Sequence, residues 1–177
     1  MKLFAAAIIV TLSVPAVASS QESKSAPLAK QLAAALESAK LDAIAAKDPA
    51  APDIFCAALY FPGVQLLVVS GKYSVPQLLI DRLMKKEYRD TYLDLNGASV
   101  PSTKVFLEDP GADGVKAKRE ENQPFDSFEA DGKRMMFDGD WKKQKVSEQD
   151  YMKAFSAADE RYTQILMALI AQLKKTS

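Results

Sequence analysis

The stretch from Ile54 to Leu95 constrains the fold of this chain more than any other. It contains two apolar runs of strand length, 54–61 and 64–69, on either side of Pro62-Gly63. Proline presets φ and glycine accepts a positive φ, so this pair is typical of a type II turn. The pattern therefore predicts an antiparallel hairpin. Neither run alternates between apolar and polar residues, so we expect both faces of the hairpin to be covered.

A helix and a third strand are expected in the rest of that stretch. Ser74 is a good N-cap, and Pro76 falls in the first helical turn, where a missing N–H does no harm. Apolar residues then recur at helical spacing, at Leu78, Leu79 and Leu83. Residues 91–96 alternate in polarity, which predicts a half-buried strand.

A helix is also expected near the N-terminus. Residues 27–47 are rich in Ala, Leu and Lys, contain no glycine, and have proline only at position 27. Their leucines recur at helical spacing, so we predict an amphipathic helix from Pro27 to Lys47 that ends before the prolines of 48–53. Residues 19–26 are mostly polar, and we expect them to form a flexible lead-in.

The C-terminal segment carries the clearest helical pattern. Ser147 and Asp150 resemble a capping box. The apolar stripe behind them comprises Tyr151, Phe155, Ala158, Tyr162, Ile165 and Leu169. A helix of about 25 residues would be roughly 38 Å long. That length exceeds what a small sheet needs, so we predict that part of this helix contacts a protein partner or a second copy of the chain.

Short strands complete the expected sheet. Residues 103–107 have β-propensity, and 125–130 and 133–137 flank Asp131-Gly132, a strong hairpin signal. Taken together, these elements predict a single α+β domain over residues 27–177. We expect a mainly antiparallel sheet of about five or six strands, with the N-terminal and C-terminal helices on one face.

The first 18 residues have the features of a signal peptide. Lys2 supplies the positive charge, residues 3–14 are mostly apolar, and Ala16-Val17-Ala18 is a small-x-small cleavage site. The apolar run is too short to span a bilayer comfortably. We therefore expect an exported protein, periplasmic or secreted, with no membrane span once the signal is removed.

The composition of the chain limits the kinds of catalytic site, metal site and partner that it can have. The chain has no histidine, which excludes Ser-His-Asp and Cys-His nucleophilic sites and histidine-ligated zinc. Its single cysteine, Cys56, lies in an apolar run and is expected to be a small buried hydrophobe. Loss of Lys2 with the signal leaves 22 of the 23 basic residues against 23 acidic ones, so nucleic acid is not an expected partner. These observations weigh against an enzyme without excluding one that works with carboxylates, lysine or tyrosine.

One candidate ligand site lies between a strand and the expected helix after it. Ser70, Lys72 and Ser74 surround a glycine there, and backbone N–H groups at a helix N-terminus can receive an anion. The alternative is structural: a helix cap and a tight turn.

A second candidate is a metal site formed by acidic residues. Asp109, Asp113, Asp138 and Asp140 lie in turn-rich segments of an expected exported protein, where calcium is a common oxygen-ligated ion. No EF-hand spacing is present, and Asp-Gly is also ordinary turn chemistry. We take no metal as the main expectation and calcium as the alternative.

Two resemblances extend this interpretation. The runs LYFPGVQLLVV, KYSVPQLL, YRDTYLDLNG, KVFLEDPGADGV and FDGDW resemble a family of small exported bacterial proteins of unassigned function. The order of elements over 54–115 is also similar to part of the flavin-binding split barrel of pyridoxamine-phosphate-oxidase-like proteins. That second resemblance implies FMN as a cofactor, with Lys72 and Ser74 at the positions that would meet its phosphate.

The sequence therefore supports two hypotheses of different classes. The first is a non-catalytic exported module that binds a partner protein or a small ligand and holds no cofactor. The alternative is a cofactor-binding split-barrel protein that holds FMN.

Overall fold

The computed structural model describes residues 23–61, 65–71, 105–130 and 132–176. In these residues, six strands form one sheet and two helices pack against it. The expected signal peptide, the helix after Ser74 and the strand at 91–96 lie outside the described residues.

The sheet is an antiparallel meander in which every strand pairs with its neighbour in sequence. Its strands are β1 (Ala43–Asp48), β2 (Ala51–Phe61), β3 (Gln65–Gly71), β4 (Val105–Pro110), β5 (Asp126–Ala130) and β6 (Lys133–Phe137). The pairing of β2 with β3 and that of β5 with β6 confirm the two predicted hairpins, while the Pro62-Gly63 turn itself lies outside the described residues.

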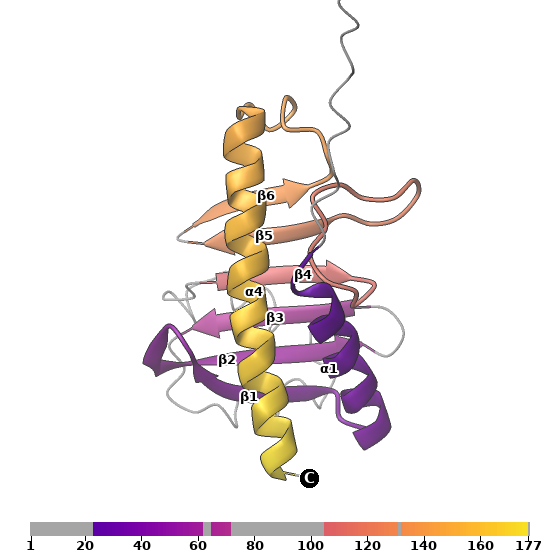
Figure 1. Cartoon of the computed structure of the whole chain (residues 1–177), viewed down its shortest axis with the longest axis vertical. Coiled ribbons are helices and arrows are strands. Elements are labelled where there is room, and N and C mark those ends of the chain that lie inside the picture. The colour runs from indigo at the N-terminus through magenta and orange to yellow at the C-terminus, as the bar shows by residue number, and fades with distance from the viewer. Residues whose placement is uncertain (1–22, 62–64, 72–104, 131, 177) are drawn as a thin grey trace, which may run out of the picture.

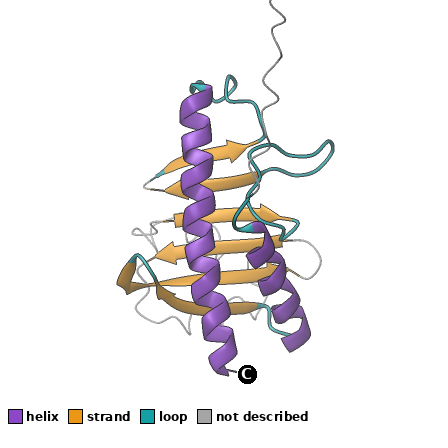
Figure 2. Ribbon diagram, viewed as in Figure 1, coloured by secondary structure: helices purple, strands orange, loops and turns teal. Residues whose placement is uncertain are grey.

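Both described helices cover the same face of this sheet, as Figure 1 shows. Helix α1 (Ala26–Ala39) lies beside α4 (Glu148–Thr176), and α4 crosses all six strands (Figure 2). The α+β class, the antiparallel sheet and the covering of one face by the terminal helices are thus confirmed. No described helix is long and apolar enough to cross a membrane.

The N-terminal helix is shorter than predicted. It ends at Ala39, and Lys40 adopts a left-handed conformation with φ 56°. The amide of Leu41 then donates to the carbonyl of Leu36 at 2.9 Å, which closes the helix end. Residues 43–47, which were expected to be helical, belong to β1 instead because pairing with β2 overrides their helix propensity.

Helix α4 begins as the sequence predicts. The amide of Asp150 donates to Ser147 Oγ at 3.0 Å, and the Ser147 hydroxyl lies 2.7 Å from Asp150 Oδ2. The whole predicted stripe is buried: Tyr151, Phe155, Ala158, Tyr162, Ile165 and Leu169. At 29 residues the helix is about 44 Å long, while six strands span about 24 Å, so its ends extend past the sheet.

The main core lies between the sheet and the helices. Buried members include Leu32 and Leu36 of α1, Val68 and Leu107 of the sheet, and most of the α4 stripe. A second apolar cluster lies on the opposite sheet face and comprises Ala43, Ala57, Leu59, Leu67, Val69 and Phe106. Two apolar faces on the central strands explain why their sequences do not alternate in polarity.

Candidate functional site

Ser70, a predicted ligand-binding residue, lies in the interior of the fold and makes a structural hydrogen bond there. It is fully buried on β3, and its hydroxyl donates to Asp48 Oδ2. Lys72 and Ser74 lie outside the described residues, so the predicted anion site is represented only by a serine that already has a partner.

Asp48 is the centre of that buried network. Besides Ser70, its carboxylate accepts from Arg161 of α4 and, at 2.8 Å, from the amide of Ala50. Burial alone would raise the pKa of Asp48, but these hydrogen bonds and the guanidinium hold the pKa below its ordinary value. The network ties the β1–β2 turn to helix α4, which is a structural role.

Cys56 is buried, as predicted. Its neighbours in the ladder are Ala46 on β1 and Ser70 on β3. Burial, with a smaller contribution from the Asp48 carboxylate, raises the pKa of its thiol to about 12. A thiol in that state is a poor nucleophile.

The four acidic residues of the calcium alternative separate into two places. Asp138 and Asp140 belong to a turn, where Asp138 Oδ1 accepts from the amide of Asp140 at 2.9 Å and Asp140 Oδ1 accepts from the amide of Lys143 at 3.1 Å. Asp109 and Asp113 lie across β5 from that turn, at and just after the end of β4. Among the residues that the structure describes, no three acidic or cysteine side chains form a group that could hold a metal ion.

Asp109 is a buried hydrogen-bond acceptor near the end of β4, whereas the sequence predicted a residue of a turn-rich loop. Its carboxylate accepts from the amides of Asp113 at 3.1 Å and Gly114 at 2.9 Å, and from the Tyr162 hydroxyl at 2.9 Å. Burial raises its pKa to about 6 despite these bonds. Asp109 therefore fastens the loop after β4 to helix α4.

Gly114 fits this loop against the start of α1. Its φ is 91°, and a Cβ at this position would lie 2.4 Å from the backbone of Ala26. The next amide, of Val115, donates to Ser25 Oγ at 3.1 Å. Only glycine allows this approach.

The segment before α1 is anchored from α4. Asp159 accepts from Ser23 Oγ at 2.8 Å and from the amides of Lys24 at 2.8 Å and Ser25 at 3.0 Å. Its carboxylate satisfies N–H groups at the helix start, where intrahelical partners are missing. Residues 23–26, the end of the expected flexible lead-in, are therefore held in place, and the rest of the lead-in lies outside the described residues.

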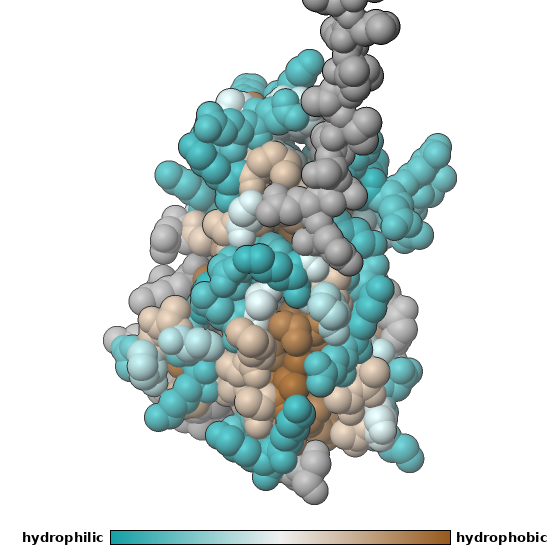
Figure 3. Space-filling model, viewed as in Figure 1, coloured by the Kyte–Doolittle hydropathy of each residue, from teal (hydrophilic) through white to brown (hydrophobic). Residues whose placement is uncertain are grey.

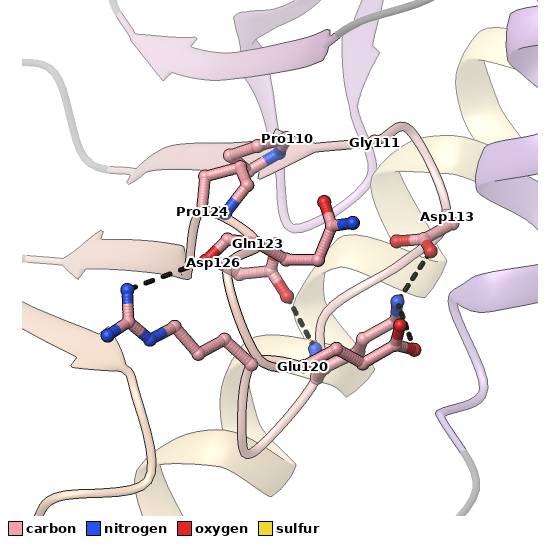
Figure 4. A pocket seen from close by; sticks show the side chains of 9 residues that line it. Pro110, Gly111, Asp113, Glu120, Gln123, Pro124 and Asp126 are labelled. Atoms are coloured by element: carbon pink, nitrogen blue, oxygen red, sulfur yellow. Dashed lines mark hydrogen bonds and ion pairs between the residues drawn. The ribbon is translucent and has the colours of Figure 1, made fainter.

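A small polar pocket lies in the connection between β4 and β5. Its cavity has a volume of about 150 Å³. It is lined by Pro110, Gly111, Asp113, Lys116, Arg119, Glu120, Gln123, Pro124 and Asp126. Figure 4 shows Pro110 and Pro124 close together at one side of the pocket and Asp113 at the other.

Asp126 is the most deeply buried titratable group of this lining, with only 5% of the residue exposed. Its Oδ2 accepts from the amide of Lys116 at 2.7 Å. Its other oxygen accepts no hydrogen bond from any residue in the described part of the chain, and it is not sealed from solvent. The pocket thus contains a carboxyl oxygen that is free to bind.

Asp126 also faces a second carboxyl. The β4–β5 ladder pairs Glu108 with Ser127, and extending this register by one residue sets Asp126 opposite Asp109 on the helix-covered face. Burial, and then the Asp109 carboxylate, raise the pKa of Asp126 to about 8. Burial and this neighbouring carboxylate therefore favour the protonated form of Asp126 at neutral pH.

Lys116 bridges two acidic side chains at the edge of the pocket. Its Nζ lies 2.6 Å from Asp113 Oδ2 and 3.6 Å from Glu120 Oε1. The hydrogen bond to Asp113 is the main cause of the raised pKa of the lysine. Arg119 contacts the Gln123 carbonyl at 3.5 Å.

The sequence did not reveal this pocket. Asp109 and Asp113 were singled out as acidic turn residues, but Asp126 was one position within an expected strand. The only signal was a carboxyl between the two phenylalanines of the run FDSF. The role of this carboxyl depends on the register between β4 and β5, which cannot be predicted from the sequence.

Comparisons of the chain with family models, with curated proteins and with solved structures find no match. The resemblances drawn from the sequence therefore stay predictions.

Proposed function

We propose that this protein is an exported, non-catalytic module that binds a small polar ligand in the β4–β5 pocket. The observation that carries the proposal is the Asp126 carboxyl, which lines the cavity and has one oxygen unused by the described residues. Buried polar groups in proteins normally have partners. A ligand that supplies this partner would gain a hydrogen bond in a desolvated setting.

The size of the cavity limits the ligand. A cavity of roughly 150 Å³ accommodates a molecule of about six non-hydrogen atoms, whereas the pockets of drug-sized ligands are roughly 300–1,000 Å³. The two prolines provide apolar contact, and the charged groups fix orientation. The ligand expected here is therefore a small polar metabolite.

Hydrogen bonds fix the conformation of the loop that forms the walls of the pocket. Asp109 fixes the loop at the amides of Asp113 and Gly114 and reaches Tyr162 of α4. The amide of Lys116 is held by Asp126. A preformed site of this kind reduces the conformational entropy lost on binding.

Binding can be tested by ligand-observed NMR against a panel of small amines, carboxylates, alcohols and sugars. Gln123→Trp places an indole at the pocket lining, and we expect it to abolish binding of any hit. Glu121→Trp makes the same change at an exposed neighbour that does not line the pocket, and it should bind normally. A panel without hits, or hits that survive Gln123→Trp, would contradict the proposal.

Export is part of the proposal and has its own test. The signal-like features of residues 1–18 support it. On expression in a bacterium, the mature protein should be found outside the cytoplasm with Ser19 as its first residue. Cytoplasmic protein that keeps residues 1–18 would refute export.

The partner-protein and flavin hypotheses stay predictions. The apolar stripe of α4 is buried on the chain's own core, and Met167, at 51%, is the exposed large hydrophobic residue of the described part. Figure 3 shows the helix-covered face as mostly hydrophilic, with apolar surface in a strip between the two helices. Size-exclusion chromatography tests self-association, and titration of FMN into the protein and its Lys72→Ala variant tests the cofactor.

A further inference from the structure

We propose that the ligand of this pocket is a small organic cation, a primary ammonium compound, and that the Asp126 carboxylate is its counter-ion. This inference rests on the proposed function, since it names the ligand class for the same pocket.

The charges around the cavity favour a cation. The acidic groups of the lining and of the strand behind it are Asp109, Asp113, Glu120 and Asp126, and the basic groups are Lys116 and Arg119. Acidic groups exceed basic ones by one when Asp126 is protonated and by two when it is ionised. A cation reduces this excess in either state, whereas an anion would increase it.

Lys116 shows that this lining accepts an ammonium group. Its Nζ lies between Asp113 Oδ2, at 2.6 Å, and Glu120 Oε1, at 3.6 Å. That ammonium is tethered to the loop itself, and it leaves the open oxygen of Asp126 without a partner among the described residues. A second ammonium, brought by a ligand, would complete the set.

The structure favours an organic cation over a metal ion. Calcium requires six to eight oxygen ligands, and no group of three acidic or cysteine side chains with metal-binding geometry occurs in the described ranges. The cavity of about 150 Å³ is also far larger than a bare ion. An ammonium on a short carbon chain needs fewer ligands than calcium and fills more of the cavity. Its carbon chain would lie against Pro110 and Pro124.

Binding should be linked to the ionisation of Asp126. The charged and titratable groups that face it are Asp109 on β4, Asp113 and Lys116 in the loop, and Tyr151 and Tyr162 on α4. Burial and the neighbouring carboxylates keep Asp126 protonated near neutral pH. An ammonium pairs with the ionised form, so binding should release close to one proton at pH 7.

Isothermal titration calorimetry with three probes that each contain four carbons tests the inference. The probes are n-butylammonium, butyrate and 1-butanol, each titrated at constant ionic strength between pH 6.5 and pH 8.5. We expect n-butylammonium to bind at least about tenfold more tightly than the other two. Its affinity should rise about tenfold per pH unit up to about pH 8 and then level off, with proton release visible in buffers of different ionisation enthalpy.

Asp126→Asn supplies the matched control. The asparagine oxygen can still accept from the Lys116 amide, so the loop should keep its shape. In this variant we expect weak n-butylammonium binding that does not change with pH and releases no proton. Equal binding of butyrate or 1-butanol, or an unchanged pH profile in Asp126→Asn, would overturn the cation inference while the pocket remained a ligand site. Failure of all three probes and of the wider panel would overturn the proposed function as well.

Discussion

Replacing Asp126 by Asn should flatten the dependence of stability on pH. The folded chain raises the pKa of this carboxyl from 3.8 to about 8. In the unfolded chain the same carboxyl is ionised throughout the neutral range. The folded state therefore binds the extra proton, so the contribution of Asp126 to stability is complete below pH 3.8, falls as pH rises toward 8, and is lost above it.

The size of the effect follows from the two pKa values. Each pH unit between them changes the free energy of unfolding by about 1.4 kcal/mol per proton. From pH 5 to pH 7.5, the ionisation difference at Asp126 lowers stability by about 3 kcal/mol. Asp109, with a pKa of about 6 against 3.8, adds a loss of about 1 kcal/mol over the same range. Such losses are a large fraction of the stability of an ordinary domain.

Urea unfolding at pH 5, 6, 7 and 7.5 measures this difference. Trp141 fluorescence and far-UV circular dichroism supply two probes, and Trp141 lies 6.3 Å from Tyr151 of α4 between ring centroids. The free energy of unfolding of the wild type should fall by about 3 kcal/mol more than that of Asp126→Asn between pH 5 and pH 7.5. Glu121→Gln, an exposed change of equal charge, should follow the wild type. Parallel curves for the wild type and Asp126→Asn would refute the buried-proton argument.

Three further substitutions test the contacts that hold the pocket in place. Tyr162→Phe removes a buried donor to Asp109 and should cost about 1–2 kcal/mol in urea unfolding, whereas an unchanged midpoint would show that the bond contributes nothing. Arg161→Ala leaves the buried carboxylate of Asp48 without its cation and should cost about 3–5 kcal/mol, most of it recovered when Asp48→Asn is added. Asp159→Ala removes three hydrogen bonds before α1, so the amides of residues 24 and 25 should lose their protection in hydrogen exchange while those of α4 keep it.

Much of the fold could be predicted because its signals are local. The Pro-Gly and Asp-Gly turns marked two hairpins, and the stripe behind Ser147 marked α4. The segment 40–47 could not be predicted correctly. Its alanines favour a helix, the helix stop is a left-handed Lys40 and not a glycine, and its strand exists only through pairing with β2.

The pocket could not be predicted because it depends on contacts between residues that are far apart in the sequence. Asp109 was recognised as an acidic residue near a turn, but its burial depends on Tyr162, 53 positions later. Asp126 acquires its role only from the register that sets it opposite Asp109. Ser70 shows the reverse: a polar residue beside a glycine suggested a ligand, and the fold uses its hydroxyl to satisfy Asp48.

The pairing of Asp109 with Asp126 also links ligand binding to the stability of the fold. Ionisation of Asp126 places a second negative charge beside the carboxylate that fastens the loop to Tyr162. A bound ammonium offsets this repulsion, so n-butylammonium should stabilise the folded state more as pH rises toward 8. At a concentration 100 times the dissociation constant, the gain is about 2.7 kcal/mol. Thermal unfolding at pH 6 and pH 8, at one fixed n-butylammonium concentration, measures it. A larger upward shift of the midpoint at pH 6 than at pH 8 would contradict the coupling, because a cation that pairs with ionised Asp126 must bind more tightly at the pH where Asp126 is more ionised.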